Sequence, residues 1–284
     1  MPVPAGPHDW GLFGPESISW RVHCSPVLLV GGLRALIIQS LNPLAMAGIA
    51  QHSDYLERPL TRLRRTAEYV ATVVYGDTAS ARRAGEMVER LHNRVQGIDP
   101  VTGSLYTADD LQTKLWVHCV EVHSFLAAYR AYGTGMSDAE QDRYLAEQVR
   151  AAELMGIPAD LVPASRAAFR SFFEFMRPGL CVSEASRDAI ELVVNPPLTR
   201  ELVPHQLSLR AMAASAVAIT PRYMRRMAGI ERSRLVYLGA GASSRIANHL
   251  MRARLFDRIG GDLVGQRTVK LPRAAKKAAR EFSR

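Results

Sequence analysis

The chain has 284 residues and a formal net charge of +9, with 48% hydrophobic and 22% charged residues. These proportions exclude an intrinsically disordered chain, and the length is sufficient for a single large hydrophobic core. The three cysteines, Cys24, Cys119 and Cys181, are far apart and odd in number. They argue against a disulfide framework or a zinc knuckle and favour a reducing compartment, so we expect a cytoplasmic protein.

The N-terminal segment, residues 1–24, is rich in proline and glycine and has no basic region followed by an apolar one. We therefore expect an irregular arm and no signal peptide. Ser25 and Pro26 then give the N-cap and first-position signals of a helix. The apolar stretch from 26 to 50 contains Arg34 and is interrupted by Pro43, so it lacks the ~20 uninterrupted residues of a membrane span. It is interpreted as a buried core helix that Pro43 kinks or ends.

The rest of the chain is dominated by helical patterns that are separated by glycine and proline. Apolar residues recur at helical spacing from Thr61 to Tyr75, with Gly76 in the position of a left-handed C-cap. Ser137 and Glu140 form a capping-box pattern before a helix that should end at Gly156. The other predicted helices begin near Asp77, Thr107, Ser165, Ser183 and Pro204, and a last one covers about 243–258. Strand-like alternation is confined to Arg234 to Leu238.

These patterns predict an all-α protein with one multi-helix domain at 25–258, between the irregular arm and a basic tail at 259–284. The excess positive charge is concentrated in the C-terminal region. No aromatic residues are interleaved with those basic side chains, as a stacking platform would require, so we expect no nucleic-acid partner. The tail is interpreted as a solvated tail, with a peripheral contact to a membrane surface as the alternative.

Arg62 and Thr66 are candidate site residues because they lie four residues apart on one predicted helix, and therefore on one face. Leu63 and Val70 continue close to that face, which would direct the guanidinium and the hydroxyl toward the interior. An arginine in that position needs an anionic partner, because burying it alone costs roughly several kcal/mol. The alternative is a surface arginine in a short basic run.

His92 lies on the apolar stripe of the next helix, where a lone histidine is either a hydrogen-bonded core residue or a metal ligand. Glu89 and His92 make one E-x-x-H pair, but a di-iron site needs a second pair, and the sequence shows no second copy. His118, Glu121 and His123 cluster on the following helix. The two histidines there are five residues apart and face different directions, so they do not form a single-helix metal site.

Motifs of hydrolase and nucleotide chemistry are absent from the sequence. The segment from Gly239 to Gly241 lacks the third glycine of a dinucleotide-binding loop, with Ser244 in its place, and too little chain follows for a βαβ unit. We find no G-x-S-x-G, Walker, H-E-x-x-H or C-x-x-C-H motif and no cysteine-ligated haem loop. Those enzyme classes have no support in the sequence.

Several of these segments together resemble the family of the oxygenase MpaB and the rubber oxygenases, or latex clearing proteins. The resemblance covers about residues 9–230. The segments are specific for the family when taken together, whereas no single motif is. The segments that carry it are Asp9 to Phe13 with Gly14-Pro15-Glu16, Gly32 to Leu36, Gln39, Pro43-Leu44-Ala45, His52-Ser53, Arg62 to Thr66, Tyr75-Gly76, Leu91-His92, Trp116-Val117-His118, Glu121 and Arg143 to Glu147.

This resemblance implies a helical fold that encloses a b-type haem with one histidine ligand on its iron. In characterised relatives, O2 chemistry splits a C=C bond in an isoprenoid. The family pattern is R-x-x-x-T followed further along the chain by the haem histidine. Arg62 and Thr66 match its first part, which implies that they order the haem and support catalysis. His92 is the first histidine after them and is the expected iron ligand, with His118 as the alternative.

The residues that differ from the family pattern bear on the reaction that is catalysed more than on haem binding. Arg65 stands where rubber oxygenases have lysine, Asn42 stands where closer relatives have histidine, and residues 39–50 offer no clear counterpart of the proposed acidic base. We therefore predict a haem b-dependent oxygenase that uses O2 on an apolar substrate, isoprenoid or lipid-like. The alternatives are a haem- or lipid-binding protein without turnover, and a helical enzyme that binds metal without porphyrin.

Overall fold

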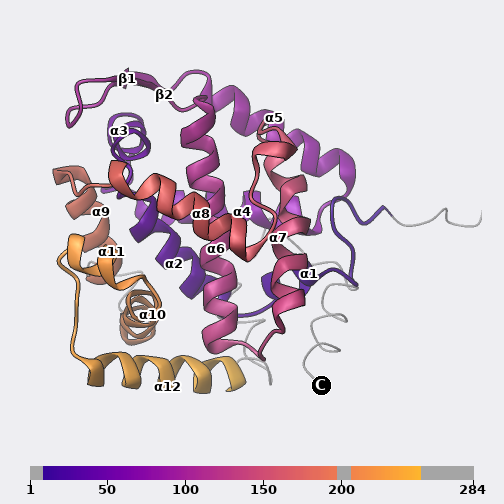
Figure 1. The fold of residues 1–284 in the computed structure, drawn as a ribbon, viewed down its shortest axis with the longest axis vertical. Coiled ribbons are helices and arrows are strands. Elements are labelled where there is room, and N and C mark those ends of the chain that lie inside the picture. The colour runs from indigo at the N-terminus through magenta and orange to yellow at the C-terminus, as the bar shows by residue number, and fades with distance from the viewer. Residues whose placement is uncertain (1–8, 197–205, 251–284) are drawn as a thin grey trace, which may run out of the picture.

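The structure is a computed structural model that describes residues 9–196 and 206–250. In this part of the chain helices dominate, as the sequence predicts, and one short hairpin is added (Figure 1). The basic tail at 259–284 and the start near Pro204 lie outside the described residues. The elements are α1 Ile18–His23, α2 Leu28–Gln39, α3 Pro43–His52, α4 Pro59–Tyr75, α5 Thr78–His92, β1 Gln96–Ile98, β2 Leu105–Thr107, α6 Leu111–Tyr132, α7 Asp138–Glu153, α8 Arg166–Met176, α9 Glu184–Val194, α10 Gln206–Ala218, α11 Arg222–Met227 and α12 Arg234–Leu250, with short 3-10 turns at Ala159–Leu161 and Arg177–Gly179.

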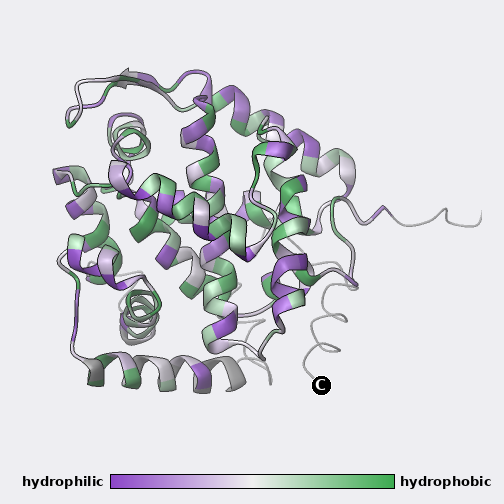
Figure 2. Ribbon diagram, viewed as in Figure 1, coloured by the Kyte–Doolittle hydropathy of each residue, from purple (hydrophilic) through white to green (hydrophobic). Residues whose placement is uncertain are grey.

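Helix α6 is the centre of the fold, and buried residues occur around most of its circumference. Helix α2 packs along it closely because Gly31 has no side chain: an added Cβ would lie 2.9 Å from the Phe125 ring. The two helices are also tied by hydrogen bonds. The Trp116 indole donates to the Gln39 carbonyl at 3.3 Å, and the Gln39 amide donates to the Val117 carbonyl at 3.1 Å. The outer helices are amphipathic. Figure 2 shows hydrophobic and hydrophilic residues alternating along α7.

The predicted break at Pro43 is present, and it divides the apolar stretch into two helices. Asn42 caps α3 by accepting a hydrogen bond from the Ala45 amide at 3.0 Å, and Pro43 occupies the first turn. The axes of α2 and α3 differ by 103°. Within the described residues, no single helix has the length and apolarity of a membrane span, although this bent pair passes that test when its two helices are taken together.

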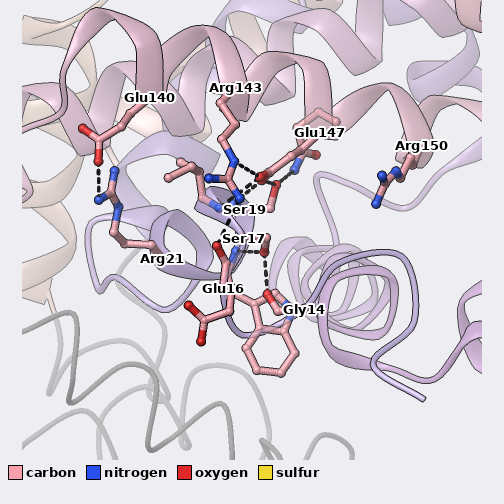
Figure 3. A network of polar contacts seen from close by, with 12 residues as sticks. Gly14, Glu16, Ser17, Ser19, Arg21, Glu140, Arg143, Glu147 and Arg150 are labelled. Atoms are coloured by element: carbon pink, nitrogen blue, oxygen red, sulfur yellow. Dashed lines mark hydrogen bonds and ion pairs between the residues drawn. The ribbon is translucent and has the colours of Figure 1, made fainter. Parts of the chain in front are cut away.

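Helix α1 corrects the expectation of an irregular arm up to residue 24, because residues 18–23 are helical. The cause is a set of polar contacts from α7, which Figure 3 shows. The Glu147 carboxylate accepts hydrogen bonds from the Ser19 amide at 2.8 Å and from the Ile18 amide at 3.2 Å. A carboxylate at this position satisfies amides that the first helical turn leaves without partners. Arg143 holds the same carboxylate at 3.0 Å, and Arg21 of α1 pairs with Glu140 at 2.6 Å.

We expect Glu147→Ala to lower the free energy of unfolding by ~1–3 kcal/mol, because the amides at the start of α1 lose their acceptor. Urea denaturation followed by circular dichroism measures this loss. Glu153→Ala is the matched control, since Glu153 lies on the same helix, is exposed, and makes no ion pair with a described residue. Equal stability of the two variants would contradict this role of Glu147.

Two local expectations are wrong, and one element was not predicted. Arg234 to Leu238 is not strand-like but forms the first turn of α12, whose Leu235 and Leu238 side chains are exposed. Gly76 is not a left-handed cap: its φ of −73° is ordinary, and it is glycine because a Cβ would lie 2.5 Å from the Thr72 carbonyl oxygen. The hairpin of β1 and β2 was not expected, since its strands have only three residues each.

Candidate functional site

Helix α4 carries Arg62 and Thr66 one turn apart, as predicted, but their surroundings differ. Arg62 is half-buried and its Nη1 donates to the Ser53 hydroxyl at 2.6 Å. Burial lowers the pKa of its guanidinium, an effect that the nearby Tyr55 partly offsets. Thr66 is exposed, which corrects the expectation that both groups point inward. The reason is that burial along α4 increases toward its C-terminal end, where Val73 and Val74 are buried.

Helix α4 has an apolar face that the described residues cover only in part. Leu63 and Val70 lie on this face and are half-buried, although their spacing is that of core positions. No carboxylate of a described residue forms an ion pair with Arg62. Helix α4 therefore presents a partly desolvated cation next to partly covered apolar surface.

His92 is the last residue of α5 and is half-buried. Its Nδ1 is buried and has no hydrogen-bond partner among the described residues. Burial lowers the pKa of this imidazole, and the positive charge of Lys114 on α6 lowers it further. The buried face of α5 differs from the predicted apolar stripe: Leu91 is exposed, and Ala81 and Gly85 are buried. The imidazole is thus neutral near pH 7 and has a nitrogen free to bind another group.

His118 and Glu121 lie three residues apart on α6 and so face nearly the same direction. The His118 Nε2 is buried without a described partner, and burial lowers the pKa of the ring to about 4. Burial raises the pKa of the Glu121 carboxyl to about 7. Burial raises the pKa of Tyr69 on α4, and the negative charge of Glu121 raises it further. The interaction with Tyr69 indicates that Glu121 lies close to α4. The raised pKa means that the Glu121 carboxyl gains or loses its proton near neutral pH.

These side chains come from three neighbouring helices, α4, α5 and α6. Tyr69 and Glu121 connect α4 electrostatically to α6, and His92 and Lys114 connect α5 to α6. Among the described residues, no hydrogen bond joins any two of Arg62, Thr66, His92 and His118. Among the described residues these four side chains form no preformed network, and their convergence on one haem stays a prediction.

Two functional candidates were not identified from the sequence. Glu121 was considered there as a neighbour of His118 and Arg34 as an interruption of an apolar stretch, and both lie in segments that carry the family resemblance, but neither was given a role. Arg34 is 1% exposed, and burial lowers its pKa to about 9. A charged residue at the centre of an otherwise apolar helix is the signal that could have identified Arg34. Glu121 had no such signal, because its burial depends on which helices cover α6.

No group of three or more histidine, cysteine, aspartate or glutamate side chains is arranged to hold a metal ion in the described ranges. A porphyrin supplies four nitrogens to its iron, so a haem needs as little as one protein ligand. A single imidazole with an unpartnered nitrogen is compatible with that chemistry. His92 and His118 both meet this condition, as do His23 and His123, and the family pattern singles out His92 as the first histidine after Arg62 and Thr66.

Comparison with protein families defines the class of the chain as the catalytic domain of an oxygenase. The model of the ER-bound oxygenase mpaB/B'/rubber oxygenase catalytic domain matches residues 20–246. The chain belongs to this family. No curated protein and no solved structure matches the chain.

Proposed function

We propose that this protein is a haem b-dependent oxygenase that acts on an apolar substrate, with His92 as the iron ligand. The oxygenase class follows from the family. The observation that carries the haem proposal is the His92 Nδ1, which is buried without a described partner at the end of α5. A neutral imidazole held in this way is a suitable haem ligand. His118 is the alternative ligand, since its Nε2 is in the same condition.

The residues around these imidazoles fit the other requirements of a haem. Its propionates need cations, and Arg62 offers a half-buried guanidinium without an acidic partner among the described residues. Its ring needs apolar surface, and Leu63 and Val70 provide a face that is only partly covered. Thr66, one turn from Arg62, contributes an exposed hydroxyl for hydrogen bonding. Haem would therefore be held between α4, α5 and α6.

The haem would supply the binding and activation of O2, and the chain would supply its environment. Val122 and Phe125 of α6 belong to a buried apolar cluster with residues of α1, α2 and α7, which would keep water from that side of α6. Glu121 would hold or release a proton, because its pKa of about 7 allows both near neutral pH. The reaction we propose is cleavage of a C=C bond or related O2 chemistry on an isoprenoid or lipid-like molecule.

The test of this function is O2 uptake by the haem-loaded protein with a panel of polyisoprenes, squalene and unsaturated fatty-acid esters. We expect uptake with at least one member and carbonyl products that contain oxygen from isotopically labelled O2. A haem-loaded protein with six-coordinate iron and no uptake with any member would instead favour a haem-binding protein without turnover.

We expect Arg62→Met to have opposite effects on the apoprotein and the haem-loaded protein. In the apoprotein, replacing a partly buried, unpaired cation by an apolar side chain should leave stability unchanged or raise it. In the loaded protein, loss of the propionate partner should weaken haem binding about tenfold. Haem transfer to apomyoglobin measures the second effect, and thermal unfolding measures the first.

Arg64→Met is the matched control, because Arg64 lies two residues away on α4 and is exposed. It should leave haem transfer at the wild-type rate. An Arg62 variant that also transfers haem at the wild-type rate would show that this arginine does not hold a propionate.

A further inference from the structure

A cavity of about 440 Å³ lies between α2, α6, α8 and α11. None of the four predicted site residues, Arg62, Thr66, His92 and His118, lines it. Apolar side chains form much of its wall, among them Leu126, Phe169, Phe173 and Met224. Five arginines also line it, with Glu174 as the acidic residue, so positive charge predominates. Such a cavity is within the range of small-molecule sites, ~300–1,000 Å³.

The most buried of these arginines is Arg34, in the middle of α2. Its Nε donates to the Ile219 carbonyl at 3.1 Å and its Nη1 donates to the Ser124 hydroxyl at 2.7 Å. These bonds use two of the five N–H groups of a guanidinium. Among the described residues no carboxylate pairs with Arg34, although burial of a cation normally requires one. The remaining donors are therefore available to an anion in the cavity.

His123 provides a second, independent observation at the buried end of the cavity. Its ring stacks on Phe169 with centroids 6.2 Å apart, and its Nδ1 is buried without a described partner. Burial, together with the positive charges of Arg34 and Arg130, holds its pKa well below the usual value. A neutral imidazole can donate one hydrogen bond, so His123 can contact an anion that Arg34 holds.

The remaining arginines surround the mouth of the cavity. Arg130, Arg170 and Arg177 are exposed and form no ion pair with a described residue. Arg177 lies over the Tyr223 ring at 4.4 Å, which fixes its guanidinium beside the opening. Arg166 differs, because Asp138 and Asp142 already neutralise it at 2.6 Å and 3.3 Å. The approach to Arg34 is thus electrostatically attractive to anions.

We propose that this cavity binds a small amphipathic anion, in which one carboxylate or phosphate group contacts Arg34 and an apolar body packs on Phe169 and Phe173. The contact partners for the head group are Arg34 and His123 at the buried end, with the exposed arginines guiding entry. The aromatic wall accounts for an apolar body, which a free inorganic anion lacks. None of the residues assigned to the haem lines this cavity, so the proposal does not depend on the haem site.

Isothermal titration of the full chain with dodecanoate, dodecyl phosphate and dodecanol tests the proposal. We expect at least one of the two anions to bind, with the tighter one identifying the head group, and dodecanol to bind at least tenfold more weakly. Equal affinity for dodecanol and both anions would show that the arginines do not select for an anionic head group and would overturn the proposal.

Substitutions of exposed residues at the mouth of the cavity test the proposal without disturbing the buried core. Arg170→Glu reverses an exposed charge and should weaken anion binding at least tenfold, whereas Arg82→Glu, an exposed arginine of α5 that does not line the cavity, should not. Unchanged binding in Arg170→Glu would contradict the proposal. Arg34→Gln should have the larger effect if circular dichroism shows that it folds.

Haem content distinguishes this site from the proposed haem site. Arg170→Glu should retain the haem absorption of the wild type while it loses the anion. Loss of haem in this variant would mean that the cavity serves the haem itself and would overturn a separate anion site.

Discussion

Replacing His92 with alanine is expected to remove the visible absorption of bound haem, and with it oxygenase activity, while the protein remains folded. The iron would lose its protein ligand, which no nearby group on α5 replaces. The fold should tolerate the change, because His92 is half-buried at the end of its helix and donates no described hydrogen bond from Nδ1. We expect a stability loss of about 1 kcal/mol. Absorption spectra and O2 uptake of purified variants measure these effects.

His52→Ala is the control for this prediction. His52 is exposed and contacts the Gln96 carbonyl at 3.1 Å, so its removal should leave the haem spectrum unchanged. His118→Ala distinguishes the two candidate ligands. A spectrum that survives in the His92 variant and disappears in the His118 variant would move the ligand from α5 to α6.

Replacing Glu121 with glutamine is expected to stabilise the protein at alkaline pH by up to about 3 kcal/mol. Burial raises the pKa of this carboxyl from 4.5 to about 7, and 1.36 kcal/mol corresponds to a tenfold change in proton affinity. The folded protein therefore holds a proton that the unfolded chain has released above pH 4.5. Because folding takes up a proton, the free energy of unfolding falls as the pH rises from about 4.5 to about 7. Glutamine cannot ionise, so the variant lacks this fall.

The measurement is urea denaturation of both proteins at pH 5 and at pH 8. Their difference isolates Glu121, since buried histidines titrate in both proteins and cancel. Glu153→Gln, which replaces an exposed acid of α7, should show the wild-type pH dependence. A constant difference between wild type and Glu121→Gln across this range would mean that the carboxyl is not desolvated.

Capping signals from adjacent residues predicted several helix starts but not all. Ser25 does not cap α2, whose N-cap is Val27, and Thr107 belongs to β2 while Asp110 caps α6. The capping box of Ser137 and Glu140 is present, and Ser165 and Ser183 are N-caps as expected. Asn42 and Pro43 also act locally, which is why the break between α2 and α3 was visible in the sequence. These signals work because the donor and the acceptor lie within three residues of each other.

Elements that depend on distant contacts were not predictable in the same way. Helix α1 needs Glu147, which follows it by more than a hundred residues, so the sequence near it suggested an irregular arm. Asp99 and Gly103 form the turn of the hairpin. The Asp99 carboxylate accepts hydrogen bonds from the Val101 and Thr102 amides, and Gly103 has a φ of +69°. These turn residues were visible, but strands of three residues give no alternation to recognise.

The candidate site was only partly predictable for the same reason. Spacing on one helix correctly put Arg62 and Thr66 one turn apart, but it did not reveal that Thr66 is exposed. Three titratable groups on α6, His118, Glu121 and His123, were visible as a cluster. Their different roles follow from what packs against each face: α4 near Glu121, and the ring of Phe169 on α8 against His123.

The central claim is that the chain binds haem, and the haem content of the wild-type protein tests it most directly. The full chain would be expressed with a haem precursor, purified, and examined by pyridine haemochrome assay beside elemental analysis for iron. We expect a Soret band and haem b in proportion to iron and to protein. Folded protein without a Soret band, or with iron but no porphyrin, would contradict it.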